Sequence, residues 1–221
     1  MNSILFTVVW ALVGAGGGWV VRWGSVRLAR LEELEPGKKV WQVYGPPILS
    51  ALLFGAFAYQ AGVVHLPLLF LRSVFVLVLV QVIFFDFEHR LILDRVMFPS
   101  MALALVLSLT GDPWWSGQGW WHGIATGLVA GLLFVLMALG GAWLFKTEAM
   151  GFGDVKLAAF MGLLLGPLPT IYAMFYGVFL AGLAAIGVIV WHRSLKGSIA
   201  YGPYLAAGAL IELFKANSPS P

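Results

Sequence analysis

The chain has 221 residues, of which 61% are hydrophobic and only 10% charged, and its mean hydropathy is +0.92. This composition excludes a soluble globular domain and is typical of a polytopic membrane protein. The expected surroundings are therefore a lipid bilayer. In that setting the formal net charge of +3 does not by itself indicate nucleic-acid binding. The absence of cysteine excludes disulfides, thiolate metal sites and a cysteine nucleophile.

Apolar segments predict an all-α fold with about eight transmembrane helices, because roughly 20 mostly apolar residues span a bilayer. In chain order they are 3–21, 46–64, 66–85, 96–110, 120–145, 155–165, 168–191 and 202–214. We expect one transmembrane domain over 1–221, with a short cytoplasmic loop at about 22–45. The first segment lacks a basic leader and is expected to remain as an anchor. The sixth segment is short and stops at Gly166 and Pro167, which fits either a half-length helix or a simple break between two helices.

Positive charge predicts the orientation. Placing the N-terminus outside puts 11 of the 13 basic residues on the cytoplasmic side, with Arg72 and Lys215 as the exceptions. The opposite side then carries an aromatic belt, composed of Trp114, Trp115, Trp120 and Trp121. A glycine run in the first segment indicates close helix packing more than a phosphate cradle; it comprises Gly14, Gly16, Gly17 and Gly18.

Five of the ten acidic residues form two clusters on the predicted cytoplasmic side: Asp86, Glu88 and Asp94 in the first, Glu148 and Asp154 in the second. Because Asp86 ends the third segment and Asp154 begins the sixth, both are expected at the same depth. Two carboxylates at one desolvated site share a proton, which is the arrangement that aspartic proteases use to activate water. The structural alternative is that Asp154 is the N-cap of the sixth helix and Asp86 marks where the third leaves the lipid.

Two motifs resemble those of the type IV prepilin peptidases. "EAMGFGDVKLAAFMGLLLG", 148–166, resembles that family's Gly-x-Gly-Asp region, and "DFEHRLILD", 86–94, is similar to its first aspartate motif. A third stretch, "YGPYLAAGAL" at 201–210, resembles the family's closing helix, so the likeness spans roughly 46–214. The resemblance implies an aspartic endopeptidase of the bacterial cytoplasmic (inner) membrane that removes the leader from prepilins or pseudopilins. It further implies Asp86 and Asp154 as the catalytic pair, and pilus or type II secretion machinery as the setting.

The remaining motif residues receive supporting roles. Gly151 and Gly153 are expected to give the chain before Asp154 access to positive φ and to let an extended substrate approach. Lys156 is expected to extend to the membrane interface, or to favour ionisation of a neighbouring carboxylate. Asp94 is expected to cap the fourth helix. Glu88 and Glu148 belong to the motifs without an assigned role, and His89 is expected in a loop.

Two departures from the family pattern affect the prediction. Leu93 stands where the family usually has proline, which is expected to loosen the turn before the fourth helix. Many bacterial members carry paired Cys-x-x-Cys motifs that bind zinc in the first cytoplasmic loop, and also methylate the new N-terminus with S-adenosylmethionine. The loop in this chain is short and has no cysteine, so neither zinc nor another cofactor is expected, and methyl transfer is not expected.

Two other functions fit the same carboxylates. One is a transporter that passes protons or cations, because acidic residues in helices also mark ion pathways. Such a path needs polar groups at mid-membrane and on both sides, whereas these acids cluster at one predicted face. The other is a catalytically inert assembly factor, which the sequence does not distinguish from an enzyme.

Overall fold

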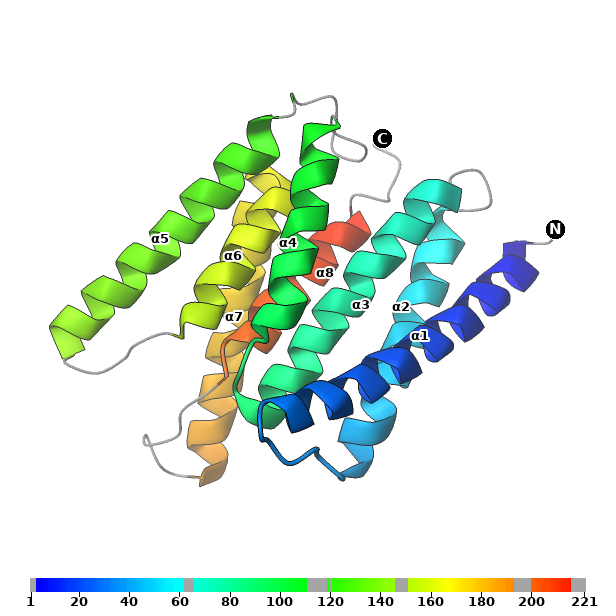
Figure 1. Cartoon of the computed structure of the whole chain (residues 1–221), viewed down its shortest axis with the longest axis horizontal. Helices are drawn as coiled ribbons and strands as arrows, with labels where there is room; N and C mark the ends of the chain where they lie inside the picture. The colour runs from blue at the N-terminus through cyan, green and yellow to red at the C-terminus, as the bar shows by residue number, and fades with distance from the viewer. Residues whose placement is uncertain are drawn as a thin grey trace. The chain divides into compact units, whose positions relative to one another are not determined.

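The structure is a computed structural model that describes residues 3–61, 66–110, 119, 121–145, 151–192 and 200–215. Within these ranges every regular element is an α-helix (Figure 1), which confirms the all-α prediction. The helices are α1 (Ser3–Leu31), α2 (Val40–Ala61), α3 (Leu66–His89), α4 (Asp94–Leu109), α5 (Trp121–Phe145), α6 (Phe152–Leu165), α7 (Pro167–His192) and α8 (Gly202–Lys215). Glu148 and three of the belt tryptophans, Trp114, Trp115 and Trp120, lie outside the described residues.

Five of these helices are long and apolar enough to cross a membrane: α1, α2, α3, α5 and α7. The other three are shorter, with 16 residues in α4 and 14 each in α6 and α8. At 1.5 Å per residue a 14-residue helix is about 21 Å long, which is less than the ~30 Å hydrocarbon core. The chain is therefore a multi-pass membrane protein, while the side on which its N-terminus lies stays a prediction.

The chain divides into two compact units, one of residues 1–90 with 213–221 and the other of residues 91–212. The first unit holds α1, α2 and α3, and the second holds α4 to α7 with most of α8. The end of α8 belongs to the first unit, where the ring of Phe214 meets that of Phe57 edge-on at 5.4 Å. A single domain over 1–221 stays a prediction.

Small residues bring α1 close to its neighbours in the first unit. A Cβ at Gly14 would lie 2.5 Å from the carbonyl oxygen of Ser50, and one at Gly18 would lie 2.4 Å from the Cα of Pro47, both on α2. A Cβ at Gly17 would lie 3.0 Å from the side chain of Leu77 on α3, and one at Gly16 would face open space. Close packing is thus confirmed for three of the four glycines, because a larger side chain there would separate the helices.

α1 extends ten residues beyond the apolar run that predicted it, because Arg22, Ser25 and Ala29 continue its buried face. It ends at a Schellman motif, in which Leu34 N–H donates to the Ala29 carbonyl at 2.8 Å. Glu33 occupies the left-handed position with φ 57°. Since α2 begins at Val40, the link between the two helices is residues 32–39, shorter than the predicted loop.

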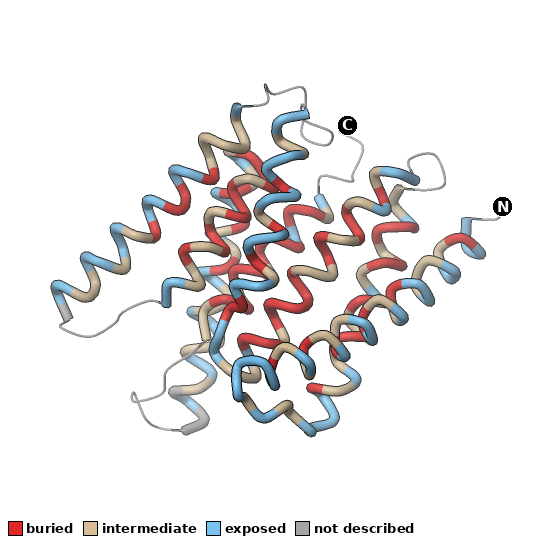
Figure 2. The backbone as a smooth tube through the Cα atoms, viewed as in Figure 1, coloured by how far each residue is buried: buried red, intermediate tan, exposed pale blue. Residues whose placement is uncertain are grey.

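α6 is the central helix of the second unit and packs against α4, α5 and α7. A Cβ at Gly162 would lie 2.6 Å from the Cα of Gly127 on α5, so the two backbones touch. Figure 2 shows burial along most of α6, in contrast to the mixed exposure of α5 and α7. The helix stops because Gly166 adopts φ 71° and ψ −174°, a conformation essentially restricted to glycine, and Pro167 then opens α7.

Candidate active site

Asp86 lies in the last turn of α3 and is 5% exposed. The helix ends just after it because Arg90 turns into the left-handed region, with φ 54°, and donates its N–H to the Asp86 carbonyl at 2.8 Å. This is an αL C-cap formed by a residue with a side chain, which costs roughly 1–2 kcal/mol relative to ordinary helical geometry. His89 is the last helical residue, so its expected place in a loop is wrong.

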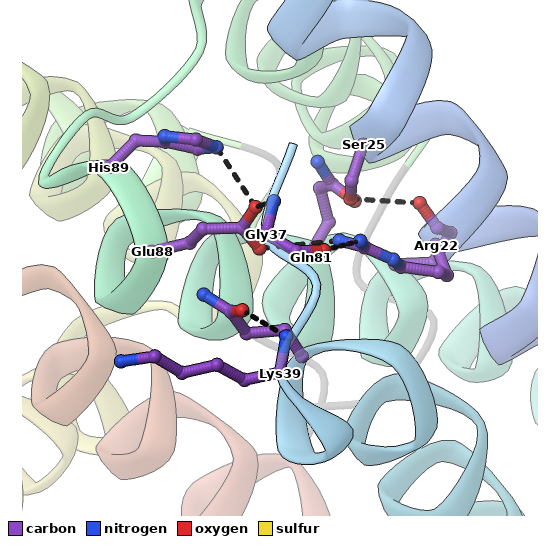
Figure 3. A network of polar contacts seen from close by, with 9 residues as sticks. Arg22, Ser25, Gly37, Lys39, Gln81, Glu88 and His89 are labelled. Atoms are coloured by element: carbon purple, nitrogen blue, oxygen red, sulfur yellow. Dashed lines mark hydrogen bonds and ion pairs between the residues drawn. The ribbon is translucent and has the colours of Figure 1, made fainter. Parts of the chain in front are cut away.

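A buried polar cluster surrounds Glu88, one residue before that helix end (Figure 3). Glu88 Oε2 lies 3.2 Å from Arg22 Nη1 of α1, and Glu88 Oε1 accepts the backbone N–H of Gly37 from the link 32–39. Arg22 Nη2 donates to the Gly37 carbonyl. His89 Nε2 lies 3.2 Å from Glu88 Oε1 without the geometry of a hydrogen bond. Glu88, whose role the sequence did not assign, is therefore at the centre of a polar network that joins α1, α3 and the link 32–39.

Asp154 is half-buried in the first turn of α6. The N-cap of this helix is Gly151, so Asp154 is its third helical residue and the N-cap alternative is wrong. Its backbone N–H donates to the Gly151 carbonyl at 3.1 Å. A carboxylate in the first turn is favoured by the partial positive charge of the helix N-terminus, which stabilises the ionised form of the side chain.

The two glycines of the motif differ in what surrounds them. Gly151 has φ −71° and ψ 146°, and Gly153 is helical, so neither adopts the positive φ that glycine makes accessible. A Cβ at Gly153 would lie 2.9 Å from the Cβ of Ile92, a residue just before α4. At Gly151 the nearest atom is Asp154 Oδ2 at 3.8 Å, which is ordinary contact. Glycine is thus required at 153 by a close approach between α6 and the chain before α4.

Lys156 and Asp94 form an ion pair between α6 and α4, with 2.5 Å between Nζ and Oδ1. The ammonium also lies over the rings of Phe98 at 5.1 Å and Phe152 at 5.0 Å. Asp94 is the first helical residue of α4, and Leu93 is its N-cap without a side-chain cap bond. The cap role expected for Asp94 is therefore wrong, and the carboxylate that Lys156 contacts is Asp94.

Tyr201, just before α8, is electrostatically coupled to Asp154. Burial raises the pKa of the Tyr201 phenol, and the negative charge of Asp154 raises it further. Its ring lies 6.5 Å from that of Phe134 on α5. The phenol therefore stays protonated at neutral pH and is able to donate a hydrogen bond.

Within each unit the structure brings together part of the predicted site. Asp86 and Glu88 share a turn of α3, and Asp154 lies on the same helix, α6, as Lys156 of the Lys156–Asp94 pair. A meeting of Asp86 with Asp154 stays a prediction because they belong to different units. No three His, Cys, Asp or Glu side chains of the described ranges come together to hold a metal ion. Sequence reasoning did not assign site roles to Arg22, Gly37, Ile92 and Tyr201. Among these four residues, only Tyr201 lies in a stretch that the sequence analysis singled out, because it opens the motif at 201–210.

The fold defines a multi-pass helical membrane protein with carboxylates at two helix ends. Residues 73–186 match the type IV leader peptidase family, and this chain belongs to that family. The match includes both Asp86 and Asp154.

Relatives named prepilin leader peptidase/N-methyltransferase resemble this chain, three of them as follows. The one from Escherichia coli (strain K12) is 32% identical over 150 residues, 66% of this chain and 61% of the relative. The one from Bacillus subtilis (strain 168) is 27% identical over 175 residues, 77% of this chain and 65% of the relative. The one from Aeromonas hydrophila is 33% identical over 149 residues, 64% of this chain and 48% of the relative. The chain thus spans about half to two thirds of these proteins, and no solved structure matches it significantly.

Proposed function

We propose that this protein is an aspartic endopeptidase of the bacterial cytoplasmic membrane that removes the leader peptide from prepilins or pseudopilins. The observation that carries the proposal is the family match over residues 73–186, which contains both motif aspartates. The names of the relatives support the substrate class. Pilus or type II secretion machinery is the corresponding partner.

In this reaction Asp86 and Asp154 act as a pair that holds one proton between them. The ionised carboxylate takes a proton from water, and the water oxygen attacks the carbonyl carbon of the scissile peptide bond. The protonated carboxyl supplies the proton that the departing amine nitrogen needs, so no charge accumulates on the leaving group. Each proton transfer by a positioned carboxyl contributes about 10²–10⁴-fold to the rate.

The local chemistry of each aspartate suits its part. Asp86 is almost fully buried in the last turn of α3. Asp154 is more exposed and stands at a helix N-terminus, which favours the charged form. The proposed assignment is therefore Asp154 as the base that activates water and Asp86 as the acid.

The test is cleavage of a prepilin by the purified protein in liposomes, followed by mass spectrometry of the new N-terminus. Asp86→Asn and Asp154→Asn are each expected to lower kcat by at least about 10²-fold while the protein stays folded and inserted. Asp94→Asn is the matched control, because it makes the same chemical change at an ion pair outside the dyad, and it should retain most activity. Cleavage at the wild-type rate by either dyad variant would refute the assignment.

The topology predicts which peptide bond is attacked. Both aspartates are predicted at the cytoplasmic face, so the substrate should present a short hydrophilic leader there and an apolar stem in the lipid. The family resemblance suggests a glycine just before the cut, and a water-poor site reached by extended backbone favours a small residue. Replacing that glycine with a large residue should block processing. Cleavage of substrate presented only from the outer face would contradict the orientation.

Methyl transfer and zinc dependence are separate questions. The relatives are named for both activities, but the link 32–39 of this chain contains neither cysteine nor histidine, so its donors do not fit a structural zinc site. We expect the cleaved product to carry an unmodified N-terminus. Label from S-adenosylmethionine appearing on that product would refute this expectation, and activity lost to a chelator and restored by zinc would refute a metal-free reaction.

A further inference from the structure

The contacts of Glu88 suggest a role other than acid–base chemistry. We propose that Arg22, Gly37 and Glu88 form a latch that fastens the link 32–39 to the end of α3 and thereby positions Asp86. The proposal rests on the peptidase function proposed above, because its consequence for Asp86 is catalytic. Glu88 is then a positioning residue, not a third catalytic acid.

The latch is a closed cycle of three members (Figure 3). Glu88 uses one carboxylate oxygen for Arg22 and the other for the Gly37 N–H. Arg22 uses one terminal nitrogen for Glu88 and the other for the Gly37 carbonyl. Each member thus contacts both of the others, and removal of any one leaves two buried polar groups without these partners. The planar fork of arginine is needed, because a lysine ammonium does not present two donors in this fixed geometry.

Burial makes the latch sensitive to loss of charge. The side chains of Arg22 and Glu88 are 9% and 6% exposed, so water replaces their contacts poorly. A buried charge that loses its partner is strongly unfavourable, so the link should move away to let water reach the remaining group. Both Glu88 oxygens already accept hydrogen bonds within the protein, which is why we assign the side chain to fastening and not to the substrate.

The link is shaped to fit this cycle. A Cβ at Gly37 would lie 2.4 Å from the side-chain amide of Gln42, so a larger residue there would displace the Gln42 side chain. Gln42 Oε1 accepts the Lys39 N–H at 2.9 Å, which closes the start of α2. The other end of the link is held by the Schellman bond from Leu34 to Ala29. The eight-residue link 32–39 is therefore held by hydrogen bonds at both ends and at Gly37 between them.

The latch reaches Asp86 through the last turn of α3. Glu88 lies between Asp86 and Arg90, and the Arg90 N–H bonds to the Asp86 carbonyl. A second bond, from Ser25 Oγ to Gln81 Oε1 at 2.7 Å, ties α1 to the preceding turns of α3. Release of Glu88 should therefore loosen the left-handed end of the helix that carries Asp86, and misplacement of a catalytic group by 1 Å is able to cost about 10²-fold in rate.

The experiment combines kinetics with the mobility of the link. The chain has no cysteine, so a single spin label placed by Lys38→Cys, at an exposed position of the link, reports its motion directly. Glu88→Gln and Arg22→Lys are each expected to increase label mobility and to lower kcat for prepilin cleavage by about 10- to 100-fold, with KM changed by less than about twofold. Glu35→Gln and Arg30→Lys are matched controls, because they repeat the Glu→Gln and Arg→Lys changes at exposed residues. They should alter neither quantity.

Different failures have different signatures. Loss of activity in Glu88→Gln with an immobile label would overturn the latch and place Glu88 in the chemistry itself. Increased label mobility with full activity would show that the latch does not position Asp86. Additive losses in the double variant Arg22→Lys/Glu88→Gln would also contradict a single unit, for which the second change should cost little. If the parent protein cleaves no prepilin at all, the proposed function fails, while label mobility still tests the fastening.

Discussion

The end of α3 and the start of α6 each carry a motif aspartate, but they are stabilised by opposite means. After Asp86 the chain is held by buried charge, because the side chains of Glu88 and Arg22 are shielded from solvent and both bond to Gly37. Before Asp154 the chain is held by the close approach of Gly153 to the side chain of Ile92. The ion pair at this end of α6, Lys156 with Asp94, is more exposed, because these side chains are 16% and 54% accessible.

The difference shows where each helix end is vulnerable. A buried ion pair that loses one partner strands a charge, whereas an exposed pair exchanges its partner for water. Packing against a glycine tolerates charge changes but not an added methyl group. Substitutions of the same chemical kind should therefore have unequal effects at the two ends.

The largest expected effect comes from removing one cation at each end. Arg22→Ala should lower the free energy of unfolding by about 3–5 kcal/mol, because it leaves the Glu88 carboxylate buried and uncompensated. Lys156→Ala should cost at most about 1–2 kcal/mol, from an exposed pair and two cation–π contacts. Reversible unfolding in mixed detergent micelles measures both. Equal losses would remove the distinction between the two ends.

The next effect compares the two motif glycines. Gly153→Ala forces its Cβ against Ile92, so overpacking should cost about 1–3 kcal/mol and reduce prepilin cleavage by displacing Asp154. Gly151→Ala has room and a backbone conformation that alanine readily adopts, so its cost should stay below about 1 kcal/mol. Thermal unfolding and cleavage rates of the two variants provide the measurement. A larger loss at 151 would contradict the proposed close contact.

A smaller effect concerns the phenol of Tyr201. The Asp154 charge disfavours the phenolate, so Asp154→Asn should lower the Tyr201 pKa, although burial keeps it above the usual value. Ultraviolet difference titration of each protein against the same protein carrying Tyr201→Phe isolates this phenol. An unchanged pKa in Asp154→Asn would mean that the two groups are not coupled.

The smallest effect is expected at Leu93. The residue has φ −73° and ψ 123°, which proline adopts without strain, so Leu93→Pro should restore the usual family residue without breaking α4. The reduced freedom of the unfolded chain adds about 0.4–1 kcal/mol of stability, offset by lost packing of a buried side chain. We expect the unfolding free energy to change by less than about 1 kcal/mol, and a helix lost by circular dichroism would contradict this.

The sequence alone determined the membrane surroundings, the helical class and most helix positions, because in lipid a long apolar run without charge is stable as an α-helix. It also located the stop at Gly166 and Pro167, where the backbone requirement is local. It misplaced the end of α1, since the helix continues past the apolar run on a face buried by tertiary packing.

Only the tertiary structure decided which residues hold the motif helices in place. Arg22 and Glu88 are 66 residues apart, and Lys156 and Asp94 are 62 apart. No periodicity or cap signal connects such pairs, because their energies arise from burial and approach after folding. For the same reason Asp94 and Asp154 read as helix caps in the sequence. In the folded chain Leu93 and Gly151 take those cap positions, while Asp94 pairs with Lys156 and Asp154 is the third residue of α6.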